Sequence, residues 1–147
     1  MTSSSIPKPV REFVKRRANF CCEYCQMAEW LSGIEGGIDH IIPRTEGGSS
    51  DPSNLCLACA SCNAYKQAKT TGVDPGSGEL VALFHPRTQQ WEEHFAWDDN
   101  PARIVGLTPC GRATIETLRL NHPLLVSART VWTRAGYHPP SIRKESA

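Results

Sequence analysis

Two pairs of cysteines with the spacing Cys-x-x-Cys constrain this chain more than any other feature of its sequence. The pairs are Cys22 with Cys25 and Cys59 with Cys62. The backbone of each pair turns tightly, so that its two sulfurs face one point, and two such pairs can supply the four ligands of a tetrahedral zinc site. A zinc ion bound there would hold the ends of residues 26–58 close together. The sequence therefore predicts a fold built around a structural zinc.

The second pair has a competitor, because Cys56 stands three residues before Cys59. Cys21 also precedes Cys22 directly, and Cys110 lies far from both pairs. We expect Cys56 to be a small buried residue and Cys110 to be structural. Two other interpretations are two unrelated reduced pairs and a thioredoxin-like redox pair. The redox interpretation is the weaker one, because neither pair begins a helix after a buried strand.

The chain has 147 residues, which is typical of one domain with an ordinary core. Its seven cysteines and the absence of an apolar N-terminal run indicate a reducing compartment, in which thiolates serve as metal ligands. No apolar stretch is long enough to span a bilayer. We therefore expect a cytoplasmic protein with no membrane partner. Its oligomeric state is left open between monomer and homodimer.

The net charge of +1 hides an uneven distribution along the chain. Residues 1–17 carry five basic residues against one acidic, and residues 100–147 carry seven against two. Residues 18–99 carry four basic residues against twelve acidic ones. Basic arms that flank an acidic, cation-binding centre would fit a nucleic-acid partner. Ordinary solvated helix faces explain the same distribution equally well.

The distribution of apolar residues, glycine and proline predicts an α+β chain. In the first part we expect a helix over 9–18, a strand over 38–42, a loop over 44–54, an extended segment over 55–57 and a helix over 59–69. In the second part we expect a loop over 71–78, a strand over 80–84, a helix over 86–94, a strand over 104–107 and helices over 109–120 and 123–135. The predicted boundary separates residues 1–70 from an extension, 71–147, that packs on the first part as one domain.

The residues between the two cysteine pairs suggest chemistry. Asp39 and His40 are neighbours within a predicted strand, and Asn63 directly follows the second pair. A carboxylate binds a hard divalent cation, a neutral imidazole takes a proton from water, and an asparagine adds a carbonyl oxygen to the same cation. Each residue is weak evidence by itself, since an Asp-His step is most often a turn or a satisfied polar pair. Together they predict a catalytic metal site.

This joint pattern resembles the HNH endonucleases, which have the ββα-metal (His-Me finger) fold. The resemblance extends over residues 8–70, and its matching segments are 22–25, 38–44, 47–48, 53–55 and 59–66. Residues 83–114 are similar to an extension found in small stand-alone bacterial members. The resemblance implies an α+β fold with a ββα-metal core, a structural tetracysteine zinc site and a C-terminal α/β extension.

The resemblance also implies a role for each matching residue. Asp39 and Asn63 would coordinate a single catalytic Mg²⁺ or Mn²⁺, and His40 would be the general base. Asn54 would brace the loop through hydrogen bonds to its backbone. Because this chain has Asn at position 63, where many relatives have His, an oxygen-preferring ion suits the catalytic site better than zinc does.

The resemblance thus implies a metal-dependent DNA endonuclease that nicks one strand per site and leaves 5′-phosphate and 3′-hydroxyl ends. Arg44, Lys66 and Lys69 are candidate phosphate contacts. Two alternatives remain open. One is a non-catalytic, zinc-stabilised nucleic-acid-binding module, and the other is a structure-specific or RNA-directed nuclease.

Overall fold

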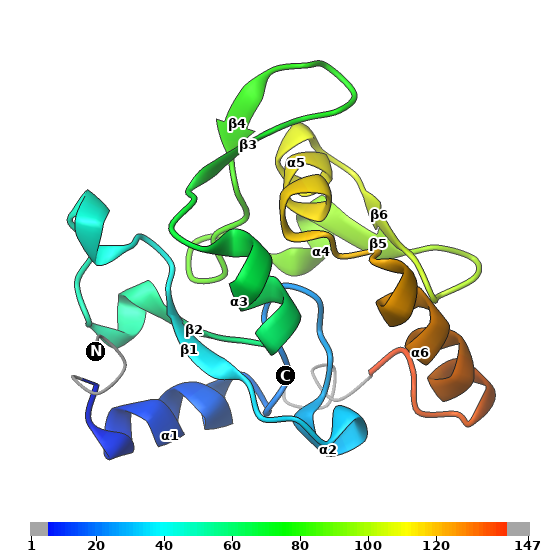
Figure 1. Cartoon of the computed structure of the whole chain (residues 1–147), viewed down its shortest axis with the longest axis horizontal. Coiled ribbons are helices and arrows are strands. Elements are labelled where there is room, and N and C mark those ends of the chain that lie inside the picture. Colours follow the sequence, from blue (N-terminus) through cyan, green and yellow to red (C-terminus); the bar gives the residue numbers. More distant parts are fainter. Residues whose placement is uncertain (1–5, 141–147) are drawn as a thin grey trace. The chain divides into compact units, whose positions relative to one another are not determined.

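This computed structural model describes residues 6–140, and the chain divides into two compact units with the boundary after Thr70. Each unit is mixed α+β, with small two-stranded sheets (Figure 1). That the second unit packs on the first as one domain stays a prediction.

The first unit is a hairpin of two strands followed by a helix. Strands β1 (Gly37–His40) and β2 (Leu55–Ala58) pair antiparallel, and α3 (Ala60–Lys66) follows β2 after a single residue. Two short 3-10 helices, η2 (Arg44–Glu46) and η3 (Pro52–Asn54), lie in the loop between the strands. This order, β1-β2-α3, is the expected ββα core. The helix ends at Lys66 rather than Lys69, because Gln67 has a φ of 52° that no α-helix continues.

Helix α1 (Lys8–Arg17) covers one face of the hairpin. Its Val14 is fully buried and forms a core with Ile6 and Leu55, against which Val10 and Ile38 pack. Figure 1 shows α1 and α3 on opposite sides of β1 and β2. Between α1 and β1 lies the short helix α2 (Glu29–Ser32), which the sequence pattern did not predict. Residues that alternate along the strands therefore face two different environments.

The second unit is built from two hairpins and two longer helices. Its elements are β3 (Thr71–Val73), β4 (Leu80–Ala82), α4 (Trp91–His94), β5 (Phe95–Trp97), β6 (Ile104–Gly106), α5 (Pro109–Leu118) and α6 (Pro123–Arg134). Helix α5 contacts β3, β4 and β6. Thr108 is the N-cap of α5, and its side chain accepts a hydrogen bond from the Gly111 amide.

Three expectations for the second unit were wrong. Residues 71–73 form a strand rather than a loop, and β5 was not predicted. The helix expected over 86–94 is confined to Trp91–His94, because the Gln89 side chain accepts from the His85 amide at 2.8 Å and closes a turn there. Trp91 is buried and Trp97 is partly buried.

Candidate active site and tetracysteine cluster

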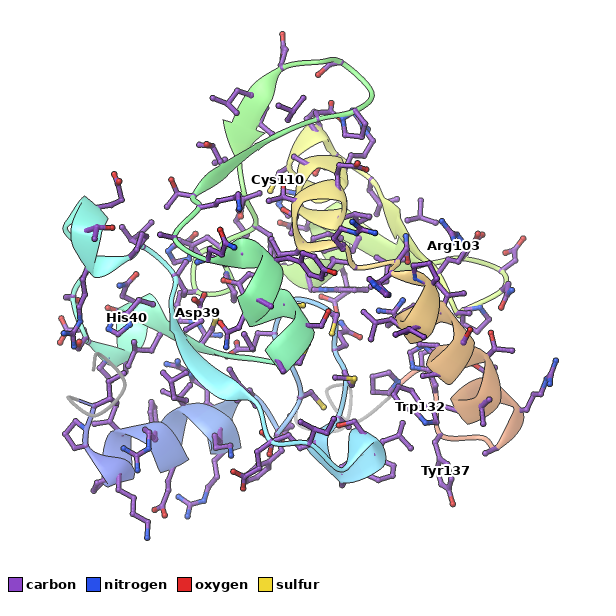
Figure 2. All side chains as sticks on the ribbon, viewed as in Figure 1. Asp39, His40, Arg103, Cys110, Trp132 and Tyr137 are labelled. Atoms are coloured by element: carbon purple, nitrogen blue, oxygen red, sulfur yellow. The ribbon has the colours of Figure 1, made fainter. Side chains whose placement is uncertain are left out.

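The two residues of the Asp39-His40 step point to opposite faces of β1, as neighbours in a strand must. Asp39 is buried beside α3, whereas His40 is partly exposed beside the loop that follows β1. Figure 2 labels both side chains, on either side of the β1 ribbon. The two residues can therefore carry different roles.

The Asp39 carboxylate has partners from three separate segments of the chain. Its Oδ2 accepts from the Tyr24 hydroxyl at 2.9 Å, and it lies 3.1 Å from the Lys66 ammonium nitrogen. The thiol of Cys56 donates to the same oxygen at 3.8 Å. The Oδ1 atom has a longer contact with Lys66 Nζ, of 3.4 Å. Burial raises the pKa of both Tyr24 and Cys56 well above the usual values, so both stay protonated donors.

Lys66 does not occupy the surface position expected of a phosphate contact. Its side chain is only 2% exposed, and Nζ also donates to the carbonyl oxygens of His40 at 3.3 Å and Ile41 at 3.1 Å. The ammonium group thus holds the end of β1 and neutralises Asp39. A buried ammonium with these partners cannot also reach a DNA backbone, so we withdraw Lys66 as a phosphate contact.

Replacing Lys66 with methionine is expected to destabilise the first unit by about 3–5 kcal/mol, because the buried Asp39 carboxylate loses its counter-ion. The midpoint of urea denaturation measures the change. Lys69→Met is the matched control, since Lys69 is exposed and its replacement should shift stability by at most ~0.5 kcal/mol. Equal midpoints for Lys66→Met and the wild type would contradict this account of the ion pair.

His40 presents its ring to the exposed side of the loop. Its Nε2 lies 3.0 Å from the Ser50 hydroxyl, and the Arg44 guanidinium approaches the same nitrogen at 3.4 Å. Arg44 also donates to Ser50 at 3.0 Å. Partial burial, assisted by the positive charges of Arg44 and Lys66, lowers the pKa of His40 below its ordinary value of 6.5. The imidazole is therefore neutral and able to accept a proton at pH 7.

Asn54 ties the two ends of this loop together. Its Oδ1 accepts from the Ile42 amide at 2.9 Å, and its Nδ2 donates to the carbonyl oxygens of Ile42 at 2.9 Å and Ser49 at 2.8 Å. Gly48 lies in the same turn, where a β-carbon would come within 1.7 Å of the Ile42 oxygen. Only glycine permits this close approach. The loop that carries Arg44 and Ser50 is thereby fixed beside His40.

Asn54→Ala should cost about 2–3 kcal/mol of stability, because it removes three hydrogen bonds worth ~0.5–1.5 kcal/mol each. It should also lower any activity that depends on His40, by loosening the loop beside it. Chemical denaturation gives the first quantity, with the exposed neighbour Ser53→Ala as control. An Asn54→Ala protein as stable as Ser53→Ala would show that these hydrogen bonds do not hold the loop.

Asn63 lies in the first turn of α3, on the side that faces β1. Its Nδ2 is 3.5 Å from the Ala58 oxygen and 3.1 Å from where a β-carbon on Gly37 would stand. Gly37 and Asp39 share one face of β1, because they are two residues apart in a strand. Asn63 and Asp39 are therefore on the same side of the hairpin, and the role of both as metal ligands stays a prediction.

The four sulfurs of Cys22, Cys25, Cys59 and Cys62 gather in one buried cluster. All four lie within 4.8 Å of one another, and the Cys25 and Cys59 sulfurs are 3.6 Å apart. Both pairs turn alike, since the amide of the second cysteine donates to the sulfur of the first, at 3.5 Å and 3.4 Å. Zn–S bonds of about 2.3 Å in a tetrahedron place sulfurs about 3.8 Å apart. The cluster thus fits a structural zinc.

The thiols of this cluster influence one another strongly. Hydrogen bonds from Cys22, Cys25 and Cys62 lower the pKa of the Cys59 thiol. The pKa values of the Cys25 and Cys62 thiols are raised instead, mainly by their hydrogen bonds with Cys22. Without a cation the cluster would therefore keep protons on part of its sulfurs. A divalent cation would allow every sulfur to ionise, which links zinc binding to proton release.

The remaining cysteines lie outside the cluster. Cys56 is fully buried in β2, as expected, and its thiol donates to Asp39 instead of facing Cys59. Cys21 donates to the Asn19 oxygen at 3.5 Å, and Cys110 is half-buried in α5. The structure thereby selects Cys59 with Cys62 over the competing pair. The expectation that neither pair begins a helix after a buried strand was wrong, because Cys59 is the N-cap of α3 and directly follows the buried strand β2. The gathering of all four sulfurs in one cluster is what favours a metal site over a redox pair.

Several residues of the basic arms bind within the chain itself. Arg17 donates to the carbonyl oxygens of Pro52 and Leu55, and Lys15 lies 3.4 Å from Glu29. Arg129 is buried and donates to the carbonyl oxygens of Ala102 and Leu120. Part of the positive charge at both ends thus supports the fold. Arg44 and Lys69 are exposed, and their role as phosphate contacts stays a prediction.

Sequence reasoning missed two residues of the site. Tyr24 was noted only as part of the first cysteine pair, and Ser50 only as part of a polar loop. The position of Tyr24 between two predicted zinc ligands could have drawn attention to it. Nothing in the sequence indicates that Ser50 reaches back to His40, because the two lie ten positions apart with no repeating pattern between them.

Comparison with known families supports the interpretation of this site. The family model described as HNH endonuclease matches residues 22–69, which include both cysteine pairs, β1, β2 and α3. Comparisons with curated proteins and with solved structures give no match. Among residues 6–140, no helix is both long and apolar enough to cross a membrane. Residues 22–69 therefore form an HNH endonuclease domain, and such a domain implies a phosphodiester hydrolase that acts on nucleic acid.

Proposed function

We propose that this chain is a metal-dependent DNA endonuclease that nicks one strand per binding event. His40 is the general base that activates water, and Asp39 and Asn63 hold one divalent cation. The single observation that supports this most is the state of His40. It is a partly exposed imidazole with a lowered pKa, on a loop braced by Asn54 and next to a buried carboxylate.

Water activation needs a neutral imidazole at the surface where the phosphate arrives. The Nε2 atom of His40 faces Ser50 and Arg44 on the exposed side of the loop. We expect an incoming phosphate to attract the Arg44 guanidinium, since planar guanidinium groups bind phosphate oxygens in pairs. Displacement of Arg44 would then leave Nε2 free to take the proton of a water molecule. The proton gained by His40 can leave to solvent.

The donor atoms near α3 fit a hard cation. Asp39 offers a carboxylate oxygen and Asn63 an amide oxygen, and Mg²⁺ typically takes one or two such protein ligands together with waters and substrate phosphates. Once bound, the cation would neutralise charge on the phosphoryl oxygens and help the 3′ oxygen to leave. Lys66 already neutralises part of the Asp39 charge. We therefore expect the phosphate itself to complete the cation site.

The tetracysteine cluster supplies the scaffold in this proposal. Cys59 is the N-cap of α3 and Cys62 lies in its first turn, so a zinc held there fixes the start of the helix that carries Asn63 and Lys66. Reduced thiols are needed for this role, and a reducing compartment such as the cytoplasm would keep the seven free cysteines reduced.

Supercoiled plasmid incubated with the purified chain and Mg²⁺ or Mn²⁺ tests the activity. We expect an open-circular product, because a single site cuts one strand, whereas linear product would require a dimer or two events. Single-stranded DNA, branched DNA and RNA at the same salt concentration test the alternative substrates. Specific binding without cleavage under any divalent cation would instead favour the non-catalytic binding module.

A further inference from the structure

Tyr24 connects the tetracysteine cluster to the Asp39 carboxylate. It lies between Cys22 and Cys25, and its side chain is fully buried. Its hydroxyl donates to Asp39 Oδ2 at 2.9 Å, across a sequence separation of fifteen residues. The Tyr24 side chain thus connects the Cys22–Cys25 turn, which carries two sulfurs of the cluster, to strand β1, which carries the Asp39 carboxylate.

The backbone around Tyr24 is fixed independently of this hydrogen bond. The Cys25 amide donates to the Cys22 sulfur at 3.5 Å, which closes the turn. The next residue toward the N-terminus, Glu23, is paired with β2: its amide donates to the Leu57 oxygen at 2.8 Å, and its carboxylate accepts from the Leu57 amide at 2.9 Å. The Cys22–Cys25 turn and its pairing with β2 therefore fix the backbone position from which the Tyr24 ring extends.

The hydrogen bond makes the two oxygens of Asp39 unequal. Oδ2 receives Tyr24 and the shorter contact of Lys66, whereas Oδ1 has the longer Lys66 contact of 3.4 Å. A carboxylate held at one oxygen cannot rotate freely, so the direction of the other oxygen is also fixed. Groups that orient a metal ligand in this way change metal affinity strongly.

We propose that Tyr24 is a positioning residue. Its hydroxyl holds Asp39 Oδ2 at a place set by the Cys22–Cys25 turn, and so directs Oδ1 toward the catalytic cation. This inference rests on the proposed function. The ring of Tyr24 packs in the core as a phenylalanine would, and its hydroxyl donates to Asp39 Oδ2. Tyr24→Phe therefore separates the positioning role from packing.

Binding of Mn²⁺, followed by electron paramagnetic resonance, tests the role without cleavage. Tyr24→Phe is compared with its parent in a His40→Ala background, with a short DNA duplex present and the signal of DNA alone subtracted. We expect Mn²⁺ to bind the Phe variant ~10–100-fold more weakly. Zinc content should stay equal in both proteins, and Tyr137→Phe, an exposed tyrosine, should leave Mn²⁺ affinity unchanged. Circular dichroism checks that both proteins are equally folded, since a partly unfolded variant would bind Mn²⁺ more weakly for that reason alone.

Each other result would overturn the inference in a recognisable way. Unchanged Mn²⁺ affinity would show that the hydroxyl does not position Asp39. Loss of zinc from Tyr24→Phe would show that Tyr24 supports the cysteine cluster rather than the carboxylate. A zinc-loaded parent that binds no Mn²⁺ beyond that of DNA, together with a wild-type chain that does not nick plasmid, would overturn the proposed function itself.

Discussion

His40→Ala is expected to lower metal-dependent plasmid nicking by ~10²–10⁴-fold, the usual contribution of a positioned general base. The side chain is partly exposed at the end of β1, and its ring contacts Ser50 and Arg44 rather than the core. Its removal should therefore leave folding and zinc content intact. Gel quantification of open-circular plasmid over time gives the rate, and circular dichroism and elemental analysis check the protein.

The same residue predicts the pH dependence of the reaction. A general base must be unprotonated, so the rate falls as pH drops through the pKa of His40. Burial and the neighbouring cations lower that pKa from its ordinary value of 6.5. The rate of the wild type should therefore be level near pH 7 and decline only below pH 6.5. A decline that begins above pH 7 would assign the titration to another group.

His122→Ala is the matched control for His40→Ala, because His122 lies outside residues 22–69 and caps α6. It should nick plasmid at the wild-type rate. An active His40→Ala protein would exclude His40 as the base. Loss of activity in His40→Ala together with loss of zinc would indicate a structural role instead.

Cys59→Ser is expected to abolish zinc binding and to unfold the ββα core. Zinc contributes apparent folding energies of ~10–16 kcal/mol in small zinc-binding domains, more than a typical domain has in reserve. Cys59 is both a cluster sulfur and the N-cap of α3, so its replacement affects the helix directly. Elemental analysis should find about one zinc per wild-type chain, as four ligands closing one site require, and none in the variant. Hydrogen exchange should show that β1 and β2 lose protection.

Two further cysteines serve as controls for this experiment. Cys110→Ser changes a half-buried thiol in α5 and should keep the zinc. Cys56→Ala removes the cysteine of the competing pair, and it should also keep the zinc, because Cys56 faces Asp39. If Cys56→Ala lost the metal while Cys62→Ser retained it, the ligand set would have to be reassigned. A zinc-free wild type would contradict the zinc site altogether.

The elements of the first unit were largely predictable because their signals are local. Apolar spacing indicated α1, the run Ile38–Ile42 indicated β1, and the cysteine spacing placed the turn before α3. The second unit was less predictable, for an equally physical reason. Gly72 is a turn signal in the sequence, yet in β3 it is required because a β-carbon there would come within 2.1 Å of the Thr117 hydroxyl of α5. Such close packing between distant elements leaves no local pattern.

The residues of the candidate site likewise divide into those that the sequence indicated and those that only the tertiary structure brings together. The resemblance to the HNH endonucleases implied His40 as the base and Asn54 as the residue that braces the loop, and the hydrogen bonds of Asn54 are consistent with its implied role. The partners of Asp39 could not be predicted, because Tyr24 and Lys66 come from fifteen residues before it and twenty-seven after. Lys66 was expected at the surface because lysines are seldom buried without a partner.

The sequence by itself determined the ligand chemistry of the tetracysteine cluster, since four cysteines in two pairs carry that chemistry in residue type and spacing. Tertiary structure decided which charges are available to a substrate. It buries Lys66 against Asp39 and leaves His40 and Arg44 at the surface. The reason is that burial depends on which faces of β1 and α3 meet, and that contact is made by residues far apart in the chain.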